Sequence, residues 1–253
     1  MTAPPLPAPP RGAAFLLGVA LGGFFDGILL HQVLQWHHLL SNVQAVQELR
    51  WQLLADGLFH ALMYVLAVAA LWRLWRRRAQ AGPASWLLAV VLAGFAAWHG
   101  LDALLSHWVL GIHRVRVDVP DPLFWDLLWL ALFGAIPLVV AAWLRRRSVG
   151  RGPAAVAGLA VLALSAGWLS LNAGAPLPGS AVVVFAPGVP PARAFEALAR
   201  FDAQVRWVDP AGAVWAVEWG REPAAWELLR HGAVLAGGTA LALGCTASTR
   251  IAS

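Results

Sequence analysis

Five long apolar stretches constrain this chain more than any other feature of its sequence. They lie at residues 13–38, 52–75, 85–110, 122–144 and 154–172. A transmembrane helix needs about 20 predominantly apolar residues, and each stretch is about that long or longer. A mean hydropathy of +0.66 with only 12% charged residues also indicates a protein that lies in lipid. The sequence therefore predicts an all-α membrane bundle of five transmembrane helices.

Arginine residues indicate the direction of these spans. Arg73 and Arg76–Arg78 close the second span, and Arg145–Arg147 close the fourth. Because loops rich in arginine stay in the cytoplasm, both ends are predicted to be cytoplasmic. The N-terminus is then cytoplasmic, and the chain after the fifth span is extracytoplasmic, in a bacterial inner (plasma) membrane. The net charge of +5 thus reflects topology. The expected partner is the lipid bilayer, and no nucleic acid is expected.

The chain divides by composition into four parts. We predict a disordered tail at 1–11, a four-helix membrane unit at 12–148, a fifth transmembrane helix at 152–173 and an extracytoplasmic domain at 174–253. In the last part, strands are expected at 181–185, 204–208, 214–218 and 233–236, and helices at 191–201 and 223–231. The order βαββαβ predicts a small α+β ferredoxin-like domain that serves for docking or shielding. The competing interpretation is a sixth span at 232–248. With the single Cys245, no thiolate cluster is possible.

Ionisable side chains recur inside the first four spans. Such residues are costly in a bilayer and are functional candidates by default. At about 1.5 Å rise per residue, His31, His60 and His99 each lie roughly 13–16 Å below the outer edge of the membrane. Three helices thus contribute one histidine each to the same layer, with Asp102 close to it. We predict that His31, His60, His99 and Asp102 form a metal site.

Further polar residues are expected around this layer. His31, Gln35 and His38 have the i, i+4, i+7 spacing of one helix face, Asp56 precedes His60 by one turn, and Asp102 follows His99. A carboxylate beside a histidine can orient its ring toward a metal. The predicted supporting residues are Asp26, Asp56, Gln35 and Trp98. Residues predicted at the outer mouth are His37, His38, His107, His113 and Asp126.

Imidazoles with carboxylates and no thiolate suit zinc, copper(II), iron, nickel or manganese, of which copper and zinc are the preferred cofactors here. Other interpretations stay open. A zinc-bound water could hydrolyse a lipid-like substrate, with Asp26 as the catalytic base. Paired histidines could hold a haem, or the polar residues could conduct protons. The remaining alternative is interhelical hydrogen bonding alone. Whether the protein is an enzyme is left undecided by the sequence.

A resemblance narrows these options. The run from Gly23 to His38, GFFDGILLHQVLQWHH, together with Asp56-Gly-Leu-Phe-His60 and His99-Gly-Leu-Asp102, resembles the motifs of a bacterial family of four-span membrane proteins of unknown function. The resemblance covers about residues 12–145. It implies a four-helix unit and an accessory role near assembly factors of a copper-dependent respiratory oxidase. The expected function is therefore binding of a transition metal near the outer leaflet, in metal handling or oxidase assembly.

Overall fold

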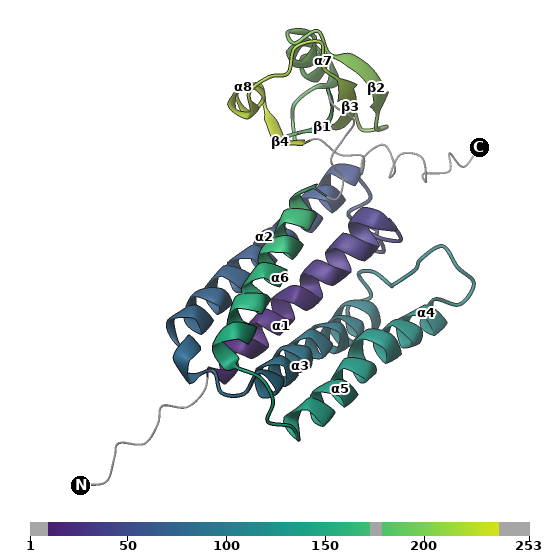
Figure 1. Ribbon diagram of the computed structural model, residues 1–253. Coiled ribbons are helices and arrows are strands. Elements are labelled where there is room, and N and C mark those ends of the chain that lie inside the picture. Colours follow the sequence, from purple (N-terminus) through teal and green to yellow (C-terminus); the bar gives the residue numbers. More distant parts are fainter. Residues whose placement is uncertain (1–9, 173–178, 238–253) are drawn as a thin grey trace.

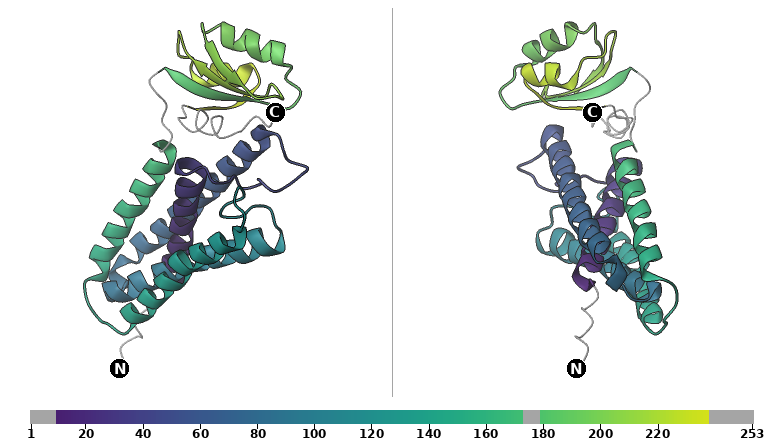
Figure 2. Two further views of the ribbon diagram at one scale, coloured as in Figure 1. Left: turned by 90° about the vertical axis from the view of Figure 1, so that its right-hand side faces the viewer. Right: turned by 60° about the vertical axis from the view of Figure 1, so that its left-hand side comes forward.

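The computed structural model describes residues 10–172 and 179–237. Within these residues, five helical segments are long and apolar enough to cross a membrane, as the sequence predicted. They form one bundle, and a small α/β domain lies beyond one end of it (Figures 1 and 2). Residues 1–9 of the predicted tail at 1–11, Cys245 and most of the alternative sixth span fall outside the described residues.

The first four spans build the bundle that holds the polar residues, and three of them contain a π-helical segment. In chain order the elements of the bundle are α1 (Arg11–Asp26), η1 (Gly27–Val33), α2 (Leu49–Arg76), the short 3₁₀ turn η2 (Arg78–Gln80), α3 (Ala84–Asp102), η3 (Ala103–Val109), α4 (Pro122–Trp129), η4 (Leu130–Ala135), α5 (Ile136–Arg145) and the fifth span α6 (Gly152–Asn172). The fourth span starts at a defined cap, because the Asp121 carboxylate accepts a hydrogen bond from the Phe124 amide.

The two π-helical segments η1 and η3 directly continue α1 and α3. In a π-helix the hydrogen bonds run from i to i+5, so residues five apart lie near one another. At each junction an aspartate is the last residue of the α-helix, and a histidine follows five residues later in the π-helical segment: Asp26 with His31, and Asp102 with His107. The change of winding therefore decides which polar side chains can meet.

Close contact between α1 and α3 fixes the centre of the bundle. A Cβ atom added at Gly18 would lie 1.9 Å from the Val91 carbonyl oxygen, and one added at Gly94 would lie 2.1 Å from the Phe15 carbonyl oxygen. Small residues of this kind let membrane helices approach until their backbones touch. Apolar side chains such as Leu17 fill the space around this contact.

Replacing Gly94 with alanine is expected to lower stability by about 3 kcal/mol or more, because the added methyl group must displace backbone rather than a flexible side chain. The check is the thermal unfolding midpoint in mild detergent. Gly100→Ala is the matched control on the same helix, since nothing lies within 4 Å of its added Cβ. Equal midpoints for the two variants would contradict the close contact.

The C-terminal domain has the predicted element order. It contains β1 (Ser180–Phe185), α7 (Pro191–Ala199), β2 (Gln204–Val208), β3 (Val214–Glu218), α8 (Ala225–Arg230) and β4 (Ala233–Gly237). The strands form an antiparallel sheet in the order β2-β3-β1-β4. Residues 233–237, which the sixth-span interpretation placed in a helix, pair with β1 instead.

Both faces of the sheet are covered, which explains why β1 is apolar at successive positions. On one face, Val183 and Phe185 pack with residues of α7 and α8. On the other face, Val182 and Val184 belong to a cluster that Leu49 and Leu53 of α2 join. The beginning of α2 is thus in contact with the domain (Figure 2).

Candidate metal centre

Buried histidines and aspartates gather at the end of the bundle opposite the arginine clusters, where η1 and η3 lead into loops. Six of these side chains have relative exposures between 1% and 9%: His31, His37, His107, His113, Asp102 and Asp126. Burial of so many ionisable groups is expensive unless they pair with one another or with a cation. The contacts among these side chains therefore indicate what the site can bind.

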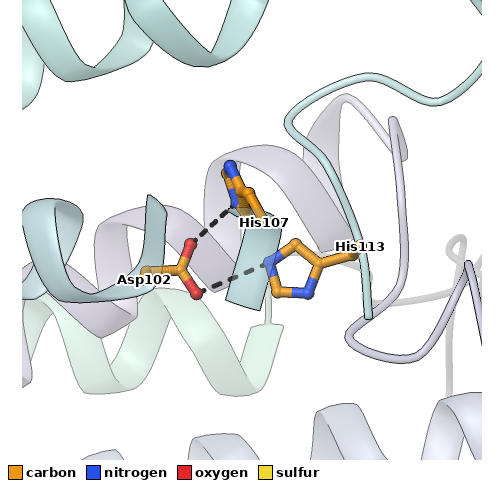
Figure 3. A group of neighbouring side chains, drawn as sticks. All are labelled: Asp102, His107 and His113. Carbon is orange, nitrogen blue, oxygen red and sulfur yellow. Dashed lines mark ion pairs between the residues drawn. The ribbon is translucent and has the colours of Figure 1, made fainter. Parts of the chain in front are cut away.

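The carboxylate of Asp102 contacts two histidines, one through each oxygen (Figure 3). Its Oδ2 atom is 3.0 Å from His107 Nε2, and its Oδ1 atom is 3.5 Å from His113 Nε2. One ligand atom from each of the three residues falls within 4.8 Å of the other two. Among the described residues this is the group whose spacing fits a metal ion.

A second set of contacts surrounds His31. Its Nδ1 atom is 3.1 Å from Asp56 Oδ1, and its Nε2 atom is 3.0 Å from His37 Nε2. Asp56 also contacts His38 Nδ1 at 2.7 Å through its other oxygen. The sequence paired Asp56 with His60 on its own helix, whereas the structure directs the carboxylate across the bundle to residues 31 and 38.

Asp126 is a fully enclosed carboxylate, with a side chain that is 0% exposed. It accepts hydrogen bonds from Arg114 Nη1 at 2.6 Å, from Trp108 Nε1 at 3.1 Å and from the Val115 amide at 3.1 Å. Its Oδ1 atom is also 3.0 Å from His107 Nδ1. The carboxylate thus orients the ring of His107 from the side opposite Asp102.

Backbone carbonyls fix the tautomers of two histidines. His37 Nδ1 is 3.1 Å from the Val115 oxygen, and His113 Nδ1 is 3.0 Å from the Leu39 oxygen. Because a carbonyl only accepts, each Nδ1 carries a proton, which leaves Nε2 as the ring nitrogen that can bind a metal. Burial, reinforced by His31 and His113, lowers the pKa of His37 well below its ordinary value, so this ring is a neutral acceptor.

His60 and His99 have other surroundings. His60 donates from Nδ1 to the Asp56 carbonyl at 2.9 Å, and its buried Nε2 has no hydrogen-bond partner within residues 10–172 and 179–237. His99 Nδ1 accepts from Trp129 Nε1 at 3.2 Å, and its ring packs edge-on against Phe25. Neither residue belongs to the group with metal-ligand spacing, which shares only Asp102 with the predicted ligand set. Coordination of one metal ion by His31, His60 and His99 stays a prediction.

One local inference from the sequence is wrong. His31, Gln35 and His38 do not form a helical stripe, because the helix becomes π-helical at Gly27 and ends at Val33. Gln35 then has a φ of +52°, and the chain turns back. This reversal carries His37, predicted at the outer mouth, into the buried network.

The other supporting residues surround the network. Asp26, buried where α1 ends, interacts electrostatically with Asp102, His31, His107 and His113. Trp98 packs against Phe59 with ring centroids 5.3 Å apart, and its buried Nε1 has no hydrogen-bond partner in the described parts of the chain. Asp26 is thus the deeper carboxylate of the centre, and Trp98 forms part of its apolar surroundings.

An internal repeat underlies this arrangement and was not recognised from the sequence. Asp26, His31 and His37 recur 76 residues later as Asp102, His107 and His113, with the same intervals of five and six. The identity extends around them, because residues 16–37 and 92–113 also share Leu16/Leu92, Gly18/Gly94, Ala20/Ala96, Leu29/Leu105, Val33/Val109 and Leu34/Leu110. A search for self-similarity would have found this signal.

The repeated segments have the same backbone and exchange equivalent contacts. After each π-helical segment comes a residue of positive φ, Gln35 in one copy and Gly111 in the other. His37 binds the carbonyl of Val115, and His113 binds that of Leu39, which is the equivalent position. The rings of His37 and His113 stack with centroids 4.6 Å apart and an interplanar angle of 6°.

The carboxylates that contact the rings of His31 and His107 are also equivalent in the two repeats. Asp56 accepts from the Leu39 amide and contacts His31 Nδ1, while Asp126 accepts from the Val115 amide and contacts His107 Nδ1. The two helix pairs are thus parallel repeats that meet at the histidine stack, as in membrane proteins built from tandem halves.

Five apolar helices around a buried histidine and aspartate network define a polytopic membrane protein with a candidate metal centre. Residues 13–148, more than half of the chain, match the family described as predicted membrane protein (DUF2243), and the chain belongs to that family. No curated protein and no solved structure matches the chain. The recognised resemblance is therefore confirmed, and the family adds no established activity to the geometry.

Proposed function

We propose that this membrane protein binds a transition metal ion through Asp102, His107 and His113 and takes part in metal handling. The observation that carries the proposal is the convergence of three buried ligand atoms within 4.8 Å of one another. His113 donates from Nδ1 to the Leu39 carbonyl, so its Nε2 is the nitrogen available to a metal, and Asp126 orients His107 as carboxylates orient metal-bound histidines elsewhere. Imidazole and carboxylate ligands suit copper(II), zinc, iron, nickel or manganese.

The location of the centre supports a role on the outer side of the membrane. It lies at the bundle end opposite Arg76–Arg78 and Arg145–Arg147, which the positive-inside rule assigns to the cytoplasm. The C-terminal domain contacts α2 at this same end through Leu49 and Leu53. Its element order and strand order support a ferredoxin-like domain that covers or docks near the centre. The implied link to oxidase assembly makes copper the first metal to test.

Haem binding by these histidines is disfavoured by their spacing. The rings of His31 and His37 have centroids 4.6 Å apart, and those of His107 and His113 have centroids 4.8 Å apart. Axial histidines must leave a macrocycle between them, and neither of these two pairs leaves room for one. A lipid hydrolase would use the same metal and would need Asp26 as its base, so metal content precedes any assay of activity.

Proton conduction is the second candidate, because one observation favours it. Polar contacts run without a break from His38 through Asp56 and His31 to His37. Toward the arginine end, however, the space between α1, α2 and α3 is filled by an apolar cluster that includes Leu17, Leu74 and Leu87. A path across the membrane would have to pass this cluster, so the network fits a localised centre better.

Elemental analysis with an optical spectrum, on full-length protein purified in mild detergent, tests the proposal. The wild type should carry stoichiometric copper or zinc and show no Soret band. His113→Ala should lose metal while remaining monodisperse, because the ring supplies a ligand and no other described residue occupies its position. His231→Ala, in the C-terminal domain, is the control and should keep wild-type metal content. Metal-free wild type after reconstitution with copper(II) and zinc would refute the proposal.

A further inference from the structure

The ligand group around Asp102 has an equivalent in the first helix pair. Asp26, His31 and His37 stand at the same intervals as Asp102, His107 and His113 and occupy the same π-helical and loop positions. We call the first set the N-terminal triad and the second the C-terminal triad. Because the two copies share sequence spacing and backbone conformation, a chemical role of one triad is expected of the other.

The orientation of the imidazoles in the N-terminal triad suits metal binding. Val115 fixes the proton of His37 on Nδ1, and the Asp56 carboxylate at 3.1 Å favours a proton on His31 Nδ1. The two Nε2 atoms face each other across 3.0 Å, where His37 accepts the hydrogen bond that His31 donates. Loss of that proton would leave two nitrogen lone pairs for one cation, since metal binding to histidine releases protons. Nitrogen ligands about 2.0–2.1 Å from one ion stand roughly 3 Å apart, so the spacing is that of neighbouring ligands.

Asp26 holds the position in this triad that Asp102 holds in the other, at the end of its α-helix. The ligand atoms of the N-terminal triad do not share the 4.8 Å spacing of the C-terminal triad, so a bound ion would have to draw the Asp26 carboxylate inward. Asp26 is buried at the end of α1 and interacts electrostatically with His31, with Asp102 and with the two histidines of the C-terminal triad. Two buried carboxylates repel one another, and bound cations remove that repulsion. The stacked rings of His37 and His113 place the two triads in direct contact.

We propose that the N-terminal triad binds a second metal ion, so that the chain holds a dinuclear centre with one ion in each triad and Asp26 and Asp102 between them. This inference rests on the proposed metal-binding function and extends it from one ion to two. Two-metal sites in proteins commonly hold their ions about 3.5–4 Å apart, which carboxylates at the boundary of two triads can support. The ligands are imidazole and carboxylate in both halves, so both ions are of the same borderline divalent class.

Metal stoichiometry of the full-length chain tests this inference. Chelator-stripped protein in mild detergent is reloaded with zinc, passed over a desalting column and analysed for metal per chain. We expect two ions in the wild type, one in His31→Ala, one in His107→Ala and none in the double variant. His231→Ala should retain two. Monodisperse elution on size exclusion identifies the variants that have folded.

Copper(II) provides a second readout, which can be measured on the wild-type protein. Two adjacent copper(II) ions couple magnetically, so the electron paramagnetic resonance spin count of fully loaded wild type should fall well below its copper content. At one copper per chain, or in a folded His31→Ala variant, spin and copper should agree.

Three results would overturn the inference. One ion in the wild type that His31→Ala retains would mean that only the C-terminal triad binds metal. One ion that either single variant abolishes would mean a single ion shared between the triads. A wild type that binds no metal would refute the proposed function itself, which the first two results leave standing.

Discussion

Replacing Asp126 with alanine is expected to destabilise the bundle by about 3 kcal/mol or more, because a buried acceptor is removed and the donors that it bound lose their hydrogen bonds. The Asp126 carboxylate has no exposed surface and accepts hydrogen bonds from Arg114, Trp108 and the Val115 amide. All three donors would lose their acceptor at once. The measurement is the thermal or denaturant unfolding midpoint in one detergent.

Asp118→Ala is the matched control for this experiment. Asp118 also pairs with an arginine of the same loop, Arg116, but its side chain is 67% exposed. Exposed ion pairs contribute about 0–1 kcal/mol, so this variant should unfold close to the wild type. Similar losses for Asp118→Ala and Asp126→Ala would show that the buried network does not hold the loop to the bundle.

Replacing Asp102 with alanine is expected to lower metal affinity by more than about 100-fold, which exceeds the roughly 10–100-fold loss typical of residues that only orient a ligand. Asp102 is the one carboxylate whose two oxygens face two different histidines of the C-terminal triad. Its removal deletes a ligand and the charge that balances the cation. Competition with a chromophoric chelator measures the change.

Asp56→Asn provides the comparison, because Asp56 contacts His31 and His38 but does not belong to the group with metal-ligand spacing. Its amide keeps a similar shape, so affinity at the C-terminal triad should fall by less than for Asp102→Ala. If Asp56→Asn has the larger effect on that triad, Asp102 is not a ligand.

The sequence predicted the coarse architecture well because its signals are local. Apolar runs of sufficient length marked all five spans, and alternation around the turn at Asp209 marked the hairpin of β2 and β3 at the residues where it occurs. Strand β1, apolar from Ala181 to Phe185, gave no alternation because residues of α2 pack on the face that would otherwise meet water. Its position was nevertheless predicted from its length and apolar content.

The site was harder to predict because its contacts depend on non-standard winding. Spacing rules for an α-helix pair residues three or four apart, and they coupled His99 with Asp102 and His60 with Asp56. In η3 the winding is π-helical, so Asp102 meets His107 five residues away. His37 and His113 reach the centre only because the loops after Val33 and Val109 fold back. Hydropathy indicates neither the π-helical winding nor the reversal of the loops, whereas the repeated intervals between Asp26, His31 and His37 were visible in the sequence.

The repeat has a consequence for how such a protein can arise. A helix pair starts and finishes on the same side of a membrane, so a tandem copy enters the bilayer in the same direction as the original. Duplication therefore needs no inversion and no additional span between the halves. Two separate copies of such a hairpin, facing each other through Gly18 and His37, would already bring together both sets of ligands. Joining them in one chain lets the halves diverge, as they have where His38 contacts Asp56 and Arg114 contacts Asp126.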